Sequence, residues 1–546
     1  MWNTTIPKFP FDQARIWKLA ASAGCGKTFQ IVRAITDLIQ ERGVHPNKIM
    51  YLVFNTGPAE ELKDKLEKSL STFDSDKDAP WMGTHHAIAR RTLKLHPDKI
   101  LEGRSLVAWG IEHGFIFGTE EDAQGDRIVT PWDEVMSRLD MYLREGAEVP
   151  LSDPLAIKLL QALYDEEILN GRYTHTRYLM KAITLRLLPD VEYIFVDEGQ
   201  DNCKLQFDLF DYIARHTDIK GLMIAGDDKQ AINGWTGGRA DLFLDFKADE
   251  YICLEKTYRC ASPILNFANE IIKPLKKRSP VVLVPSGLGG RVERYGTFDW
   301  TMPVLRKLVK AGIVIYILVR ARCFKIPVKA SLKRWGLPYR SGIRERVSVI
   351  IQAMRVLASK SESDWTWDDL LPLLPNEEPI KGGIKKTAYW PRRAAMRFRT
   401  GEYSLEEEPD LCTDWLRFMG GDRHGINLRD FGFTQKFFED IKNSMIRFPR
   451  GVWYDLTDED IVAFEHETKE FGMNVQGIHV MTIHASKSSE CDVAVLIRNI
   501  TTRIAQTEYH TPDNERRVWY VGATRAKTGL LITDLPDAGY QKTALV

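Results

Sequence analysis

The stretch Leu19-Ala-Ala-Ser-Ala-Gly-Cys-Gly-Lys-Thr28 decides how the rest of the chain is interpreted. An apolar run, residues 16–19, precedes it, and a helical pattern, residues 29–40, follows it. A strand, a turn of small residues and a helix that begins near Gly-Lys-Thr are the context of a phosphate-binding loop. Backbone N–H groups at such a helix N-terminus favour a bound phosphate. The alternative is an ordinary small-residue turn, because Ala21 stands where the usual pattern opens with glycine.

Two side chains of this loop carry the expected chemistry. Lys27 would reach the β- and γ-phosphates, and the Thr28 hydroxyl would hold Mg²⁺. We expect oxidation or alkylation of Cys25, which lies inside the loop, to block nucleotide binding. Gln13, a short distance upstream, is predicted to contact the adenine. The full set of loop residues predicted to bind the nucleotide is Ala21, Ser22, Ala23, Gly24, Cys25, Gly26, Lys27 and Thr28.

The composition excludes few classes of function. A chain of 546 residues, 44% hydrophobic and 27% charged, has room for several globular domains. Lys plus Arg equals Asp plus Glu, at 75 each, so the net charge gives no hint of nucleic acid, although a local basic groove would suffice to bind it. The seven cysteines include no Cys-x-x-Cys pair, which argues against structural zinc or an iron–sulfur cluster. Without a membrane-length apolar run or a signal-peptide pattern, we expect a cytoplasmic enzyme that does not bind membranes.

Acidic side chains follow a second apolar strand, residues 191–196. Asp197 and Glu198 lie at its C-terminal end, where ligands bind in open α/β sheets. Asp197 is placed to hold Mg²⁺, and Glu198 is placed to orient and deprotonate an attacking water. A strand that ends in acids is also common on protein surfaces. The next strand, residues 221–225, leads to Gln230, whose neutral amide suits sensing of a γ-phosphate.

Aromatic and basic residues indicate contacts with bases and phosphates. Trp235 lies between glycines, so its ring is free to stack unless it is a core tryptophan. Tyr258 beside Arg259 suits stacking on a base and clamping a phosphate, although a solvated surface pair has the same pattern. Residues 381–399 hold seven basic residues and no acid, interleaved with aromatic rings, which is typical of a nucleic-acid contact or of a solvated loop. The basic residues singled out there are Lys385, Lys386, Arg392 and Arg393.

Taken together, in this order and spacing, the motifs resemble the UvrD/PcrA/Rep branch of superfamily 1 helicases, from about residue 16 to 534. The matching segments are Ala21–Thr28, Asp197–Asp201, Gly226–Gly237, Tyr258-Arg259, Thr482–Glu490 and Tyr520–Ala526. The resemblance implies an α/β fold with two RecA-like motor domains, in which helices flank parallel sheets. It also implies an ATP-dependent DNA helicase that moves 3′-to-5′ on single strands, unwinds duplex DNA and serves replication, repair or recombination.

Two breaks in the strand–helix rhythm set the expected domain limits, since each motor domain of the family carries an inserted, mainly helical subdomain. The first motor domain would comprise residues 1–94 and 189–250, with residues 95–188 as its insert. The second would comprise residues 251–356 and 475–546, with residues 357–474 as its insert.

The resemblance also supplies roles for single residues. Tyr258 would pack on the adenine and Glu490 would contact the ribose. Arg259 and Arg525 would act as arginine fingers on the two sides of the phosphate, so that ATP closes the cleft and hydrolysis releases it. Contacts with single-stranded DNA are implied for Phe54, Thr84, His85, Trp235 and His484. The basic segment 381–399 falls in the second insert, which would touch the duplex.

The sequence departs from the family pattern at two places. Ser22 replaces a glycine of the loop, and residues 488, 489 and 491 (Ser, Ser and Cys) replace Gly, Leu and an aromatic residue, so coupling to DNA through this segment is expected to differ. The alternative function is a single-stranded DNA translocase that displaces bound proteins and unwinds poorly without a partner. Expected partners are single-stranded and tailed duplex DNA and single-strand-binding or loading proteins, in a bacterial or phage-encoded context.

Overall fold

The computed structural model describes residues 11, 14–70, 73–118, 129–280, 283–285, 289–340, 356–357, 359–361, 364–366, 369, 469–471, 477–536 and 540–546. The chain divides into two compact units. The first unit comprises residues 1–301, 315–328 and 481–546, and the second comprises residues 302–314 and 329–480. Several residues with predicted roles lie outside the described residues, namely Gln13, Lys385, Lys386, Arg392 and Arg393.

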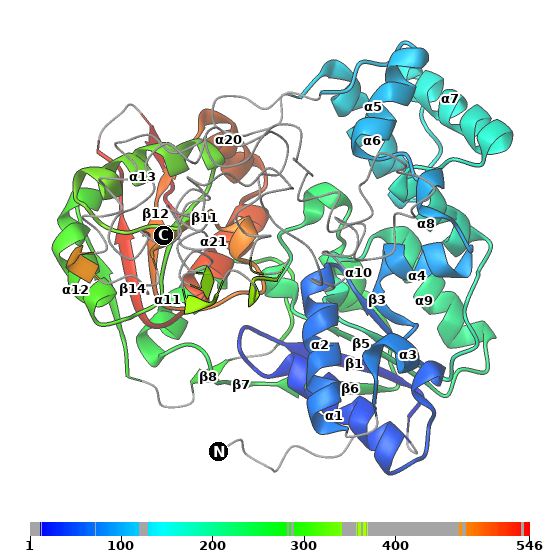
Figure 1. Ribbon diagram of the computed structural model, residues 1–546, viewed down its shortest axis with the longest axis horizontal. Coiled ribbons are helices and arrows are strands. Elements are labelled where there is room, and N and C mark those ends of the chain that lie inside the picture. The colour runs from blue at the N-terminus through cyan, green and yellow to red at the C-terminus, as the bar shows by residue number, and fades with distance from the viewer. Residues whose placement is uncertain are drawn as a thin grey trace. The chain divides into compact units, whose positions relative to one another are not determined.

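A six-stranded sheet in the order β3-β2-β4-β5-β1-β6 forms part of the first unit, and its paired strands are parallel. The strands predicted near residues 16, 191 and 221 are confirmed as β1, β4 and β5, and the apolar run at residues 49–53 forms β2. The strands are β1 (Ile16–Ala21), β2 (Ile49–Val53), β3 (Met82–Thr84), β4 (Tyr193–Val196), β5 (Gly221–Gly226) and β6 (Glu250–Leu254). The helices that accompany them are α1 (Lys27–Gln40), α2 (Thr56–Ser69), α3 (Ser75–Asp78), α4 (His85–Thr92), α9 (Lys204–His216) and α10 (Ala240–Asp245) (Figure 1).

Helices cover both faces of this sheet. Successive strand residues point to opposite faces, so a strand that is apolar throughout needs a helix layer on each face to bury its side chains. Leu19 and Tyr51 belong to a core that includes the buried face of α1 and α2. Leu52 and Ile194 belong to a second core with Phe210 of α9. Burial on both faces explains why these strands are continuous apolar runs in the sequence. Asn, Gly and Pro within residues 55–58 are typical of a turn, and a turn expected there on that ground is wrong: residues 56–58 form the first turn of α2, where proline loses no intrahelical hydrogen bond.

The segment between β3 and β4 is mainly helical, as the sequence predicts. It contains α5 (Gly103–Glu112), α6 (Pro131–Arg144), α7 (Pro154–Asn170) and α8 (His175–Thr184). Trp109, Leu139 and Leu159 lie in its own buried core. The last helix begins at His175, because the side chain of Thr174 accepts a hydrogen bond from the N–H of Arg177 and caps it.

A five-stranded sheet in the order β11-β10-β12-β14-β9 follows. The pairs β10–β12, β12–β14 and β14–β9 are parallel. Residues 515–527 read as a helix in the sequence, but the helix ends at Ala523, so Arg525 lies in the connection before the last long strand and not on a helix. The strands of this sheet are β9 (Arg291–Arg294), β10 (Ile315–Val319), β11 (His479–Thr482), β12 (Cys491–Ile497) and β14 (Ala526–Thr533). The helices of this part of the chain are α11 (Ser262–Ile272), α12 (Met302–Lys310), α13 (Lys325–Arg334), α20 (Thr502–His510) and α21 (Pro512–Ala523).

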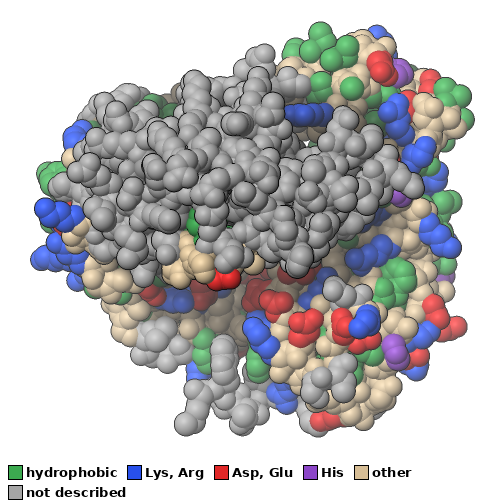
Figure 2. All heavy atoms as spheres, in the orientation of Figure 1, with side chains coloured by type: hydrophobic (Ala, Val, Ile, Leu, Met, Phe, Trp, Pro, Cys, Tyr) green, Lys and Arg blue, Asp and Glu red, His purple; other side chains and the backbone are tan. Residues whose placement is uncertain are grey.

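The fold class is therefore α/β with two sheets of parallel strands flanked by helices, as predicted. Two short strand pairs complete it, β7 (Lys256–Thr257) with β8 (Val284–Pro285), and β13 (Asn499–Ile500) with β15 (Gln541–Lys542). Over the described residues, the helices are too short or too polar to cross a membrane. Acidic and basic side chains are interspersed on the described surface that Figure 2 shows, in keeping with 75 residues of each sign.

Candidate nucleotide-binding site

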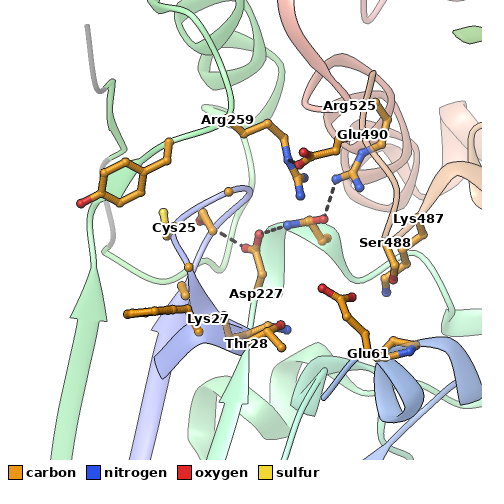
Figure 3. Close-up of a pocket in the computed structure, with 18 of the residues that line it drawn as sticks. Cys25, Lys27, Thr28, Glu61, Asp227, Arg259, Lys487, Ser488, Glu490 and Arg525 are labelled. Atoms are coloured by element: carbon orange, nitrogen blue, oxygen red, sulfur yellow. Dashed lines mark hydrogen bonds and ion pairs between the residues drawn. The ribbon is translucent and has the colours of Figure 1, made fainter. Parts of the chain in front are cut away.

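A cavity of about 880 Å³ in the first unit brings together most of the predicted nucleotide-binding residues. Figure 3 shows the loop residues Lys27 and Thr28 on one side and Arg259, Glu490 and Arg525 on the other, with Asp227 between the two groups. The predicted residues that line the cavity are Ala21, Ser22, Gly24, Cys25, Gly26, Lys27, Thr28, Asp197, Glu198, Gln230, Tyr258, Arg259, Glu490 and Arg525. Ala23 is buried, and its carbonyl accepts a hydrogen bond of 2.7 Å from the Thr257 hydroxyl.

The phosphate loop is fastened to the segment that carries Tyr258 and Arg259. Gly24 has a φ of +73°, and a Cβ at this position would lie 2.3 Å from the Cβ of Arg259, so only glycine fits. The Tyr258 N–H donates to the Gly24 carbonyl at 2.9 Å. Ser22, which replaces a glycine of the family pattern, is buried, and its hydroxyl donates to Asp227 at 3.3 Å. The serine therefore ties the phosphate loop to the residue that follows β5.

The helix that follows the loop presents the expected cation. Helix α1 begins at Lys27 with no acid in its first turn, so its unpaired N–H groups lie beside the loop. The Lys27 Nζ is 2.7 Å from Asp197 Oδ1 and 2.5 Å from Glu198 Oε1. Burial opposes the ammonium charge, but these two carboxylates raise the pKa of Lys27 above its usual value. The Lys27 side chain is therefore held as an ammonium ion in this arrangement.

Glu198 sits in a constrained position. Its φ of +55° is in the left-handed region, which non-glycine residues adopt rarely and often at functional sites. The Gln200 amide donates to its Oε2 at 2.5 Å. Burial raises the pKa of Glu198, but the charges of Lys27 and Lys487 outweigh burial and lower that pKa to about 2. Its neighbour Asp197 accepts a hydrogen bond of 3.0 Å from the Tyr51 hydroxyl.

A chain of hydrogen bonds joins Glu198 to Arg525. The carbonyl oxygen of the Gln200 side chain accepts from the Asp227 N–H at 2.9 Å. The Gln230 amide donates to Asp227 Oδ2 at 2.5 Å, and Arg525 donates to Gln230 Oε1 at 2.8 Å. Burial raises the pKa of Asp227 to about 6. The γ-phosphate sensor proposed from the sequence thus contacts an acid on one side and a proposed arginine finger on the other.

An ion-paired cluster lies on the far side of the cavity. Glu490 accepts from Arg259 Nε at 2.8 Å and pairs with Lys527 Nζ at 2.8 Å. Burial raises the pKa of Glu490, but Lys527 and Arg259 outweigh it and lower that pKa below its usual value. The residue proposed to contact the ribose therefore also holds one of the two proposed arginine fingers.

Several residues of the cavity were not predicted from the sequence. Asp227 and Lys487 lie inside motifs that the sequence analysis quoted, and Lys487 forms an ion pair with Asp201. Glu61 and Lys65 of α2 form a 2.6 Å (i, i+4) pair of the kind found on any helix surface, so no signal marks them. The others are Phe29, Pro58, Ser488, Asp492, Lys527 and Thr528.

Four of the residues predicted to contact DNA, Phe54, Thr84, His85 and His484, are not among the described residues that line this cavity. Thr84 accepts a hydrogen bond from the Ala87 N–H and caps α4. His85 is only 9% exposed, and burial lowers its pKa to about 3. His484 is half-buried, and burial together with Arg320 lowers its pKa to about 4. Phe54 follows β2, and Trp235 lies in the short helix η5 (Gly234–Thr236). Their contact with DNA stays a prediction.

A hydroxyl and a carboxylate in the cavity form a donor set that suits Mg²⁺, which binds oxygen ligands. Thr28 and Asp197 both line the cavity beside Lys27, whose ammonium already lies against the Asp197 carboxylate. These residues therefore fit a cation bound together with phosphate oxygens. Among the described residues, no group of three or more His, Cys, Asp or Glu side chains could hold a metal ion. The predicted lack of a zinc or iron–sulfur site stays a prediction.

A phosphate loop, paired acids and two arginines from connecting segments, one directly before β14 of the second sheet, define a nucleoside-triphosphate-hydrolysing motor of the α/β class. The model of the UvrD/REP helicase N-terminal domain matches residues 11–125 and 132–250, and that of the UvrD-like helicase C-terminal domain matches residues 459–535. The chain belongs to the UvrD/REP family of ATP-dependent DNA helicases.

One relative is similar to this chain over most of its length, and another over about half of it. The ATP-dependent DNA helicase PcrA of Staphylococcus epidermidis is 27% identical over 94% of this chain and 81% of its own length. The protein of the same name from Staphylococcus aureus strain Mu50 is 26% identical over 51% of this chain and 40% of its own length. ATP is therefore the nucleotide that the family uses.

Proposed function

We propose that the chain moves 3′-to-5′ along single-stranded DNA and unwinds duplex DNA, driven by ATP hydrolysis in the cavity. The observation that supports this proposal is the composition of the cavity. Lys27, Asp197 and Glu198 come from the first sheet, and Arg259 and Arg525 come from segments that adjoin the second sheet. Charge on the transferring phosphoryl group would therefore be neutralised from both sides.

In the proposed mechanism, bound ATP replaces some of the ion pairs that the cavity residues make with one another when ATP is absent. Lys27 would leave Asp197 and Glu198 for the phosphates, while Thr28 and Asp197 would hold Mg²⁺, which supplies further charge neutralisation when bound. Glu198, no longer paired with Lys27, would then be free to accept a hydrogen bond from the attacking water and to take its proton. Tyr258 would pack on the adenine, and Glu490 would exchange Arg259 for the ribose.

Movement along DNA would follow from a change in the hydrogen bonds that Gln230 makes. Loss of the γ-phosphate would change what Gln230 and Arg525 contact, and the loop that carries Trp235 begins directly after Gln230. The predicted contacts with single-stranded DNA (Phe54, Thr84, His85, Trp235 and His484) require stacking and backbone recognition, in keeping with translocation that ignores sequence. The motor-domain and insert limits given above, the second insert's contact with the duplex, and loading proteins as partners belong to the same proposal.

Strand displacement tests the proposal. The substrates are a 3′-tailed duplex, a 5′-tailed duplex and a blunt duplex, each with ATP and Mg²⁺, and Lys27→Ala is the control. We expect unwinding from the 3′ tail alone and none with the variant. Unwinding from the 5′ tail alone would overturn the polarity. DNA-stimulated hydrolysis without unwinding would favour the alternative, a translocase that displaces bound proteins and needs a partner.

A further inference from the structure

Two adjacent residues of the helical segment hold the loop that follows Gln230 through hydrogen bonds and an ion pair. Arg144, the last residue of α6, donates from NH1 to the Thr236 carbonyl at 2.6 Å. Its NH2 donates to the Thr176 hydroxyl of α8 at 3.3 Å, which fixes the guanidinium between the loop and the helical segment. Glu145 pairs with Arg239 at 2.7 Å, at the other end of the same loop. The loop, residues 231–239, is thus held at two points three residues apart.

The opposite side of the loop rests on the segment that follows Glu198. The Arg239 N–H donates to the Asn202 carbonyl at 2.9 Å. Gly237 has a φ of +85°, and a Cβ there would lie 3.5 Å from side-chain atoms of both Arg144 and Cys203. The loop backbone is therefore packed between the side chain of Arg144 and the residues that follow Glu198.

We propose that Arg144 and Glu145 are positioning residues that couple DNA to ATP hydrolysis. They hold the backbone of residues 231–239, the loop that carries the predicted DNA contact Trp235 and that follows Gln230, the partner of Arg525. The inference rests on the proposed function. Neither residue lines the nucleotide cavity. Loss of their contacts with the loop therefore removes the coupling between DNA and ATP hydrolysis and leaves the cavity itself intact.

DNA-stimulated ATP hydrolysis is the first measurement. In Arg144→Ala, hydrolysis without DNA is expected to stay close to the wild-type rate, while the stimulation by saturating oligothymidylate falls about tenfold. Arg144→Lys keeps a cation that can reach Thr236 but not the planar fork that also holds Thr176, so it restores part of the stimulation. Arg138→Ala is the matched control, because Arg138 lies on the same helix and pairs with Asp153 at 2.9 Å. It should leave the stimulation unchanged.

A second measurement separates positioning from direct contact with DNA. If Arg144 bound a phosphate, Arg144→Ala would reduce the slope of log affinity against log salt by about one. A positioning residue leaves that slope unchanged. Glu145→Gln sharpens the distinction, because removing an acid cannot weaken a phosphate contact. We expect it to lower the stimulation in the same direction as Arg144→Ala, by a smaller factor.

Hydrogen exchange of the backbone amides of residues 233–239 gives a readout that does not depend on activity. Exchange is expected to be faster in Arg144→Ala than in wild type and unchanged in Arg138→Ala. Unchanged exchange, wild-type stimulation in Arg144→Ala or a reduced salt slope would each overturn the inference and leave the proposed function standing. A wild-type protein that DNA does not stimulate would overturn the proposed function as well.

Discussion

The guanidinium of Arg525 donates a 2.8 Å hydrogen bond to the side-chain carbonyl of Gln230, a residue 295 positions earlier in the chain. Arg525 is buried, and it also donates to the carbonyls of Val521 and Ser489. Gln230 in turn donates to Asp227. One amide side chain therefore links the arginine that precedes β14 to the acid that follows β5.

Gln230→Ala is expected to uncouple the two halves of the cavity. The substitution leaves a buried guanidinium N–H and a buried carboxylate oxygen without the partner they share, while Lys27 and the phosphate loop stay in place. The turnover number should fall about a hundredfold, with little change in the KM for ATP. Steady-state hydrolysis with saturating DNA measures both constants. A change confined to KM would contradict a role in the transition state.

The raised pKa of Asp227 predicts a pH-dependent stability. The pKa is about 6 in the folded protein and 3.8 in an unfolded chain, so between these values the folded state holds the extra proton. Stability is therefore full below about pH 4 and falls as the pH rises through 6, by about 3 kcal/mol from this residue.

Chemical denaturation at intervals from pH 4.5 to 7 measures this dependence. Asp227→Asn has no carboxyl group to titrate at this position. Its free energy of unfolding should therefore fall less than that of wild type as the pH rises through this range. Two curves that run parallel across the range would contradict the assignment to Asp227.

Cys25 is expected to resist alkylation, contrary to what its place in the phosphate loop suggests. Its side chain is 3% exposed, and burial raises the pKa of the thiol to about 12. Since the thiolate is the nucleophile, well under about 0.1% of the protein is reactive at neutral pH. Iodoacetamide followed by peptide mass spectrometry should leave Cys25 unmodified while the half-exposed Cys253 and Cys323 react. Fast labelling of Cys25 with loss of ATP hydrolysis would restore the expectation drawn from the sequence.

Ser488 carries backbone strain that glycine would relieve. It has a φ of +70° and lines the cavity at a position where the family pattern has glycine. A left-handed conformation costs a non-glycine residue about 1–2 kcal/mol, so Ser488→Gly should stabilise the fold by up to about 1 kcal/mol after the entropy of the unfolded glycine is counted. Ser489→Gly is the matched control and should destabilise, because Ser489 is not among the residues with positive φ. Denaturation midpoints in urea compare the two variants.

The sequence alone determined the strands, the phosphate loop and the family. Strands β1, β2, β4 and β5 are buried on both faces, so each appears as an uninterrupted apolar run that local reading detects. The loop between β1 and α1 is equally local, since its glycines and Lys27 are set by a single turn. Motif order and spacing then indicated which side chains belong to one site.

Only the tertiary structure decided which of these side chains touch one another. The links from Gln230 to Arg525 and from Arg144 to Thr236 join residues far apart in sequence, and they depend on the path of the chain between them. The helix around Arg525 ended earlier than its pattern suggested, because the strand that starts at Ala526 pairs with β12. Sequence periodicity reports which face of an element is buried, but hydrogen bonds between elements are chosen by packing, and packing exists only in the folded chain.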